Sequence, residues 1–152
     1  MKELCLSPDN LSGLLDILLG EKHAQRVKIP CKGFSMSPFI SDSDTIVIEP
    51  LNTIRNLRIG DIVVVLLSKQ KIIIHRIIRI KDGSLLLKGD NLADCDGWFK
   101  KREVMGIVEA VFKKKFNYRC NPFINYIIAI GSRTKIFNRF LVCIKKLKTK
   151  YV

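Results

Sequence analysis

Three short segments of this sequence carry residue types that can do chemistry. Residues 33–40 (GFSMSPFI) hold Ser35 just before a proline-containing turn, a setting that exposes a hydroxyl and can aim backbone N–H groups. Residues 72–78 (IIIHRII) place His75 inside an apolar run, where a polar side chain costs about 1–3 kcal/mol unless it finds a partner. Residues 88–96 (KGDNLADCD) contain three aspartates within seven residues. A hydroxyl, an imidazole and a carboxylate are the groups of nucleophilic hydrolysis.

The order of these groups along the chain follows the logic of a Ser-His-Asp hydrolase: nucleophile, base on a strand, orienting acid. Side chains alternate between the two faces of a strand, so His75 shares a face with Ile73 and Ile77. Arg76 then points to the opposite face. A neutral histidine can accept the proton of a serine hydroxyl. Chain order differs among unrelated hydrolase folds, so order alone does not establish the reaction.

Each segment also has a purely structural interpretation. Ser-Pro turns are common in loops, and His75 can be a core histidine bonded to a backbone carbonyl. The aspartates of residues 90–96 can form a solvated acidic turn. Calcium binding is disfavoured, because this loop lacks the alternating oxygen ligands and the terminal glutamate of an EF-hand. The sequence predicts no metal site and no cofactor.

The elements that must position these groups are mainly β-strands. Residues 7–20 have the leucine spacing of a short helix that Gly20 can end. From Val27 onward, runs of Ile, Val and Leu predict strands over residues 45–49, 61–67, 71–80, 85–88 and 104–112. Asp82-Gly83 predicts a tight hairpin, and residues 68–70 allow a second one.

Charge is distributed unevenly along the 152 residues. Residues 1–112 carry 16 Lys/Arg and 14 Asp/Glu, whereas residues 113–152 carry 11 Lys/Arg and no acid. Such a tail favours a polyanionic partner, either anionic lipid or nucleic acid. Lipid is favoured, because apolar side chains recur at helical spacing and most cations lie off that face. These apolar residues are Ile136, Phe137, Phe140, Leu141, Ile144 and Leu147. The alternative is a surface helix that packs on the β core.

The remaining composition indicates an N-terminal helical segment (1–26), a β domain (27–112) and a basic amphipathic tail (113–152). No apolar run approaches the roughly 20 residues of a membrane span, and no secretory signal is visible. The five cysteines form no C-x-x-C pair, which favours a reducing compartment. We therefore expect a cytoplasmic protein, peripheral at the inner face of the cytoplasmic membrane.

Four ordered motifs and a closing strand resemble the type I signal peptidases and their relatives, the self-cleaving repressors of the SOS response. They are residues 33–38 (GFSMSP), 60–63 (GDIV), 75–77 (HRI), 89–91 (GDN) and the strand 104–108. The resemblance implies a signal-peptidase-like mixed β-sheet or barrel core. Histidine at position 75 resembles the archaeal and endoplasmic-reticulum type, whereas most bacterial members have lysine there.

The resemblance implies a role for each matching residue. Ser35 would be the nucleophile, His75 the general base and Asp96 the orienting acid. Gly33 stands where many bacterial members have an oxyanion-binding serine, so the backbone N–H of Ser35 would have to serve. Whether Lys71 assists or replaces the histidine stays open. The site-shaping residues would be Gly33, Met36, Pro38, Arg76, Gly89, Asp90 and Asn91.

The leading functional expectation is a serine endopeptidase that cuts leader or signal peptides, or preproteins, at or near a membrane. The alternatives are a self-cleaving regulatory module that binds nucleic acid and a catalytically inactive scaffold. Residues 1–26 leave no room for a helix-turn-helix domain, which disfavours the regulatory module. No Ala-Gly or Cys-Gly bond, the usual self-cleavage site of the repressors, occurs in the chain.

Overall fold

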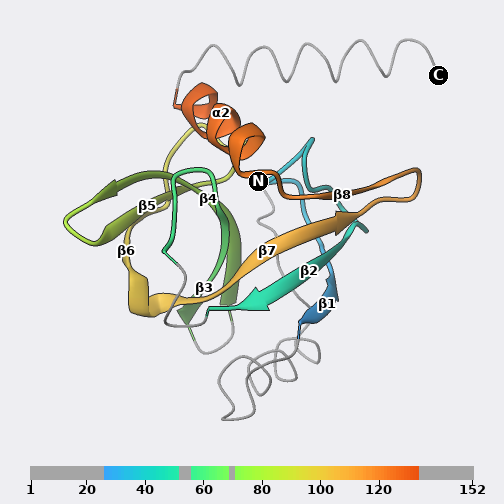
Figure 1. The fold of residues 1–152 in the computed structure, drawn as a ribbon, viewed down its shortest axis with the longest axis horizontal. Helices are drawn as coiled ribbons and strands as arrows, with labels where there is room; N and C mark the ends of the chain where they lie inside the picture. Colours follow the sequence, from blue (N-terminus) through green and yellow to red (C-terminus); the bar gives the residue numbers. More distant parts are fainter. Residues whose placement is uncertain (1–25, 52–55, 69–70, 134–152) are drawn as a thin grey trace.

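A computed structural model describes residues 26–51, 56–68 and 71–133 (Figure 1). The helices predicted over residues 7–20 and within the tail at residues 136–147 lie outside these ranges. The described elements are β1 (Val27–Pro30), β2 (Thr45–Pro50), β3 (Ile62–Ser68), β4 (Lys71–Lys81), β5 (Ser84–Lys88), β6 (Gly97–Lys100), the 3₁₀ turn η1 (Lys101–Glu103), β7 (Val104–Phe112), β8 (Asn117–Arg119) and the helix α2 (Pro122–Ser132).

The mainly β fold is confirmed, and all five strands given bounds from sequence appear within one or two residues of their expected ends. Asp82 and Gly83 both have positive φ and join β4 to β5, which confirms the tight hairpin. Ser68 pairs with Lys71, so β3 and β4 also form a hairpin, although residues 69 and 70 are not described. The short strands β6 and β8 were not predicted.

The strands form one antiparallel sheet in the order β1-β2-β7-β3-β4-β5-β6, with β8 paired to β7. This path is open within the described residues, with β1 at one end and β6 at the other. Figure 1 shows that the sheet is strongly curved, so that β5 and β6 lie on one side of the molecule and β1 and β2 on the other. The long strand β4 runs through the middle.

Both faces of the central strands are buried, which explains their uninterrupted apolar sequences. On β3, Ile62 and Val64 belong to one hydrophobic cluster, whereas Val63 and Val65 belong to a second one. On β4 the same alternation places Ile74 in the first cluster, and Ile73 and Ile77 in the second. A strand buried on both faces therefore carries His75 to the second cluster and Arg76 to the first.

The helix α2 closes the described part of the chain and packs on β4. Its N-terminus is capped by Asn121, whose side-chain oxygen accepts hydrogen bonds from the N–H groups of Phe123 and Ile124. At its other end, Arg133 Nε donates to the carbonyl of Ile78 at 2.8 Å. Thus β8 and α2, although they lie in the range expected as a tail, pack against the β domain. Among the described residues, no helix is long and apolar enough to cross a membrane.

Candidate active site

Ser35 lies in a compact turn between β1 and β2. The N–H of Ser37 donates to the carbonyl of Phe34 at 3.1 Å, and that of Ile40 donates to the carbonyl of Met36 at 3.0 Å. Met36 is fully buried in the first hydrophobic cluster and anchors the turn to the sheet. Ser35 itself is 1% exposed. The turn thus holds the serine against the sheet rather than in solvent.

His75 comes from the middle of β4, opposite Val63 of β3, and is fully buried. Its Nε2 lies 2.9 Å from Ser35 Oγ. Its Nδ1 lies 2.6 Å from Asp96 Oδ2. The three side chains predicted from sequence as nucleophile, base and acid are therefore brought together in one continuous hydrogen-bonded chain.

The chemistry of the groups sets the direction of these hydrogen bonds. An ionised carboxylate can only accept, so with Asp96 ionised the proton lies on His75 Nδ1. The neutral imidazole then presents the lone pair of Nε2 to the hydroxyl of Ser35. In this tautomer Nε2 is placed to take the proton of Ser35. Burial of the pair keeps competing water away from both hydrogen bonds.

Asp96 lies at the end of the loop that follows β5. The N–H of Asp96 donates to the carbonyl of Leu87 at 2.9 Å, which fixes the end of the loop to β5. At the start of the loop, the N–H of Asn91 donates to the carbonyl of Ser35 at 2.7 Å, and its side-chain Nδ2 donates to the carbonyl of Phe34 at 3.1 Å. One loop thus holds the acid and the backbone of the serine together.

Close approach of the two backbones explains the glycine in this loop. A Cβ added at Gly89 would lie 2.8 Å from the carbonyl oxygen of Ser35 and 2.8 Å from Cγ of Leu92. Real Cβ atoms essentially never come that close. Any side chain at position 89 would therefore push the loop away from the serine turn.

The loop is also fixed from the other face of β4. Arg76 Nε and one terminal nitrogen donate to the two carboxylate oxygens of Asp90 at 2.8 and 2.7 Å, and both side chains are fully buried. The other terminal nitrogen donates to the carbonyl of Gly60 at 2.9 Å. A bidentate pair of this kind fixes direction as well as distance. Arg76 and Asp90 thus orient the loop without lying in the hydrogen-bonded chain of Ser35.

A comparison with models of protein families identifies the family of this chain. Residues 15–108 match the model of the peptidase S24-like family. The chain belongs to this family. The match spans more than half of the chain and includes Ser35, His75 and Asp96. The resemblance to signal peptidases and self-cleaving repressors is thereby confirmed as kinship within a serine-peptidase-like fold. A comparison with curated protein sequences gives no match.

Two further residues predicted for the site of this peptidase S24-like protein shape the serine turn. The N–H of Gly33 donates to Asp42 Oδ1 at 2.9 Å, and its φ of 110° lies in a region that glycine tolerates far better than serine does. A serine at position 33 would be strained in this conformation. The carbonyl of Pro38 accepts from Lys113 Nζ at 3.3 Å, at the end of the turn away from His75.

The other residues that the sequence raised as candidates lie as follows. The carboxylates of Asp90 and Asp96 point to different partners, on opposite faces of β4, and Asp94 is exposed. Across the described ranges, no three His, Cys, Asp or Glu side chains gather as metal ligands would. Lys71 begins β4, but its side chain lies outside the described part of the structure.

One buried titratable residue near the site was missed from sequence. Lys88, the last residue of β5, is only 3% exposed, and its Nζ lies 3.4 Å from the carbonyl oxygen of Gly89. Burial lowers the pKa of Lys88, and the negative charges of Asp90 and neighbouring groups oppose this shift only in part. A lysine at the end of an apolar strand normally indicates that the strand end is exposed to solvent. No sequence signal therefore predicted that Lys88 is buried.

Proposed function

We propose that this peptidase S24-like protein is a serine endopeptidase that cuts peptide bonds with Ser35, His75 and Asp96. The observation that carries the proposal is the unbroken chain of hydrogen bonds from Asp96 through both ring nitrogens of His75 to Ser35 Oγ. Each of the three groups comes from a different part of the fold. A core histidine can be satisfied by backbone groups alone, whereas a serine hydroxyl at Nε2 and a carboxylate at Nδ1 form the arrangement of a catalytic triad.

The proposed reaction proceeds in two stages. Ser35 Oγ attacks the carbonyl carbon of the peptide bond while its proton moves to His75 Nε2. The imidazolium, held by the carboxylate of Asp96, then gives that proton to the departing amine, which leaves the acyl group on Ser35. Water attacks this ester, again with His75 as base, and releases the acid and the free serine.

The oxyanion of the tetrahedral intermediate needs hydrogen-bond donors in place before the reaction. Glycine at position 33 has no hydroxyl to offer, and its N–H is held by Asp42. We assign this role to the backbone N–H of Ser35. The bond from Asn91 to the carbonyl of Ser35 would hold this peptide group in orientation.

The proposed substrates are leader or signal peptides of preproteins, cut at or near the inner face of the cytoplasmic membrane. Kinship with a family that resembles the signal peptidases supports this substrate class. The strongly basic range 113–152 supports a site of action close to anionic lipid rather than nucleic acid.

A comparison of protein N-termini in cells tests the proposal without a guess at the substrate. Cells would carry the wild-type chain, Ser35→Ala, His75→Ala or the control Ser41→Ala. Ser41 lies in the same loop, and its backbone N–H bonds to Asp44. We expect the same few precursors to stay uncut with Ser35→Ala and His75→Ala, and to be processed normally with Ser41→Ala. Identical N-termini in all four strains, with all four proteins present, would overturn the peptidase and favour a non-catalytic scaffold.

A further inference from the structure

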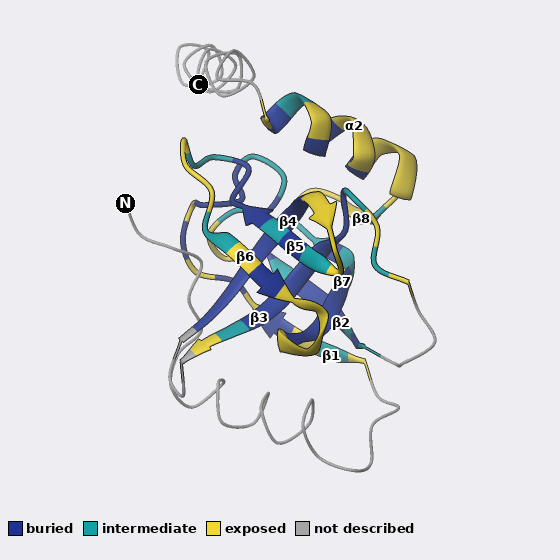
Figure 2. Cartoon of the chain, turned by 90° about the vertical axis from the view of Figure 1, so that its left-hand side faces the viewer, coloured by how far each residue is buried: buried dark blue, intermediate teal, exposed yellow. Residues whose placement is uncertain are grey.

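One face of α2 is apolar and exposed. At about 100° per residue, its five large exposed side chains span an arc of about 160°, and the buried positions Asn125, Ile128, Ala129 and Ser132 lie opposite. Figure 2 shows the exposed side of α2 turned away from the sheet. The exposed side chains, with their exposed fractions, are Phe123 (72%), Ile124 (55%), Tyr126 (48%), Ile127 (52%) and Ile130 (37%).

The packing beneath α2 fixes this face outward. A Cβ at Gly60 would lie 2.7 Å from the backbone carbon of Asn125 and 2.7 Å from the backbone nitrogen of Tyr126, so the helix backbone rests directly on the turn before β3. Arg133 ties the other end of α2 to the carbonyl of Ile78. Rotation of α2 to bury its apolar face would break both contacts. The exposed face is therefore a fixed feature of the fold.

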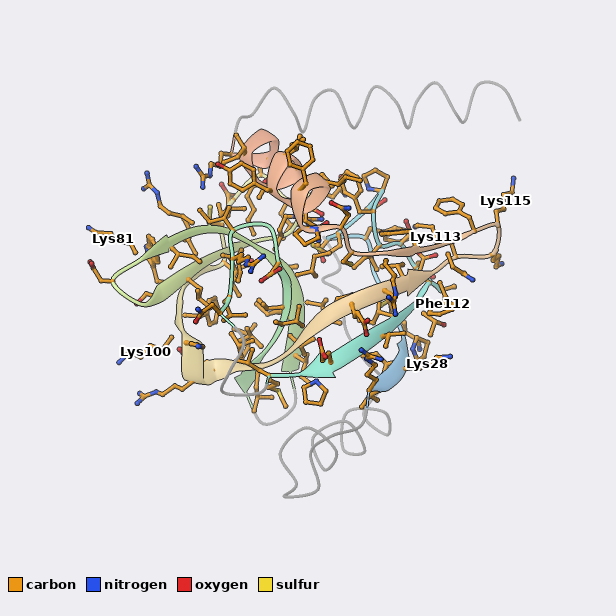
Figure 3. All side chains as sticks on the ribbon, viewed as in Figure 1. Lys28, Lys81, Lys100, Phe112, Lys113 and Lys115 are labelled. Carbon is orange, nitrogen blue, oxygen red and sulfur yellow. The ribbon has the colours of Figure 1, made fainter. Side chains whose placement is uncertain are left out.

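Exposed cations lie beside this face, although Lys113 is paired with Asp44 at 2.6 Å and Arg119 with Glu109 at 3.3 Å. The helix itself carries no charged residue, and from residue 113 to residue 152 the chain contains no acid. Lys114 and Lys115 are exposed in the turn between β7 and β8, where Figure 3 shows Lys115 at the tip. A cavity of about 300 Å³ is lined by Phe116 and Arg119 from this region and by Ile124 of α2. The basic turn and the apolar helix face thus border one surface.

We propose that this surface, formed by α2 and the turn at residues 113–116, docks on an anionic lipid bilayer. The apolar side chains would enter the boundary between headgroups and acyl chains, to a depth of about 5–10 Å. Exposed aromatic rings such as Phe116 and Phe123 suit that boundary. The flanking cations would lie among the anionic headgroups. The inference does not depend on cleavage by Ser35.

The cations beside this face favour an anionic bilayer over a second copy of the chain or another protein. A second copy of the chain packed face to face would bury the same uncharged helix face but would offer no anionic partner from α2 to the flanking cations. The cores of protein interfaces are depleted of lysine, whereas the exposed Lys114 and Lys115 beside the apolar face of α2 complement anionic headgroups. A bilayer rich in anionic lipid satisfies both the apolar helix and the surrounding cations.

Vesicle sedimentation of the full chain tests the apolar contribution. The vesicles are phosphatidylcholine with or without phosphatidylglycerol. We expect Phe123→Gln/Ile127→Gln to reduce binding to the anionic vesicles about tenfold or more. The matched control, Leu67→Gln/Ile80→Gln, removes two exposed apolar side chains from β3 and β4 and should bind like the wild type. Circular dichroism and thermal unfolding would verify that each variant folds.

A second pair of variants tests the charge. Lys114→Gln/Lys115→Gln should weaken binding to the anionic vesicles about fivefold for each charge, and Lys81→Gln/Lys100→Gln should not. Figure 3 shows Lys81 and Lys100 on the side of the molecule away from Lys113 and Lys115. Three outcomes would overturn the proposal: no binding of the wild type, equal binding of the folded α2 variant, or a dimer in sedimentation velocity that Phe123→Gln/Ile127→Gln dissolves.

Discussion

His75 and Arg76 are adjacent on β4, and their side chains hold the same loop from opposite faces of the sheet. His75 Nδ1 bonds to Asp96 at the end of the loop, and Arg76 bonds to Asp90 near its start. The alternation of a strand produces this division, because neighbouring side chains point to opposite faces. The loop that carries the proposed acid is thus fixed at two points by two successive residues.

Breaking the buried pair of Arg76 and Asp90 should destabilise the protein strongly. Arg76→Met leaves the carboxylate of Asp90 buried without its partner, and such a change costs about 3–5 kcal/mol in the free energy of unfolding. Arg76→Met/Asp90→Leu removes both charges and should be less destabilised than the single variant. Urea unfolding of the wild type, Arg76→Met, Asp90→Leu and the double variant measures these differences. If the double variant loses as much as the sum of the two single changes, the pair is not coupled as described.

Replacing the proposed orienting acid should reduce the rate of cleavage while the fold stays intact. Asp96→Asn retains the shape of the side chain but can donate to His75, which favours the wrong tautomer of the imidazole. In a serine protease the corresponding loss is about 10⁴-fold in kcat. Asp94→Asn, in the same loop but exposed, should cleave at the wild-type rate. Once N-terminal comparison has supplied a substrate peptide, the rates can be measured directly; equal rates for both variants would remove Asp96 from the mechanism.

Much of the site could be predicted from sequence, because its parts follow from local patterns. The alternation on β4 separates His75 from Arg76, and Asp82-Gly83 specifies the hairpin to β5. Strand ends then place the loop with Asp90 beside the serine turn. The distances could not be predicted, since the bonds from His75 to Ser35 and Asp96 span 40 and 21 positions in the chain.

The helix α2 shows what sequence patterns missed. Its buried positions are occupied by Asn125, Ile128, Ala129 and Ser132, two of them polar, while large apolar residues face outward. This arrangement inverts the usual amphipathic pattern. Residues 123–130 therefore form an apolar run in which no polar face indicates a helix. The cap formed by Asn121 just before a proline was the signal that could have placed the start of the helix.

The buried lysine should make stability depend on pH in the alkaline range. Burial lowers the pKa of Lys88 in the folded state below its ordinary 10.5, so the unfolded chain binds more protons between these two values. Stability contributed by this residue therefore rises as pH increases through that window. Lys88→Met has no titrating group at this position, so its free energy of unfolding should not show this rise. Relative to the wild type, the variant should therefore become less stable as the pH increases from 7 to 10. Urea unfolding at several pH values measures this, with exposed Lys100→Met as control; a constant difference would contradict it.

A side chain at position 60 should disturb the packing of α2 on the turn before β3. Gly60→Ala places a Cβ within 2.8 Å of the backbone of Asn125 and Tyr126, at a φ of 101°. Gly97→Ala is the matched control, because its φ of 114° is similar and no atom lies within 4 Å of the added Cβ. We expect the control to lose about 1–2 kcal/mol from backbone strain and Gly60→Ala to lose about 1–3 kcal/mol more from overpacking.

The additional loss of stability in Gly60→Ala should arise at α2, because the added Cβ meets the backbone of this helix. Hydrogen exchange of the α2 amides should accelerate in Gly60→Ala and stay at the wild-type rate in Gly97→Ala. The same displacement should weaken vesicle binding, since the apolar face of α2 would no longer be held outward. Equal unfolding free energies for the two variants would show that α2 yields to the added carbon at no cost, and that its contact with Gly60 does not fix the helix.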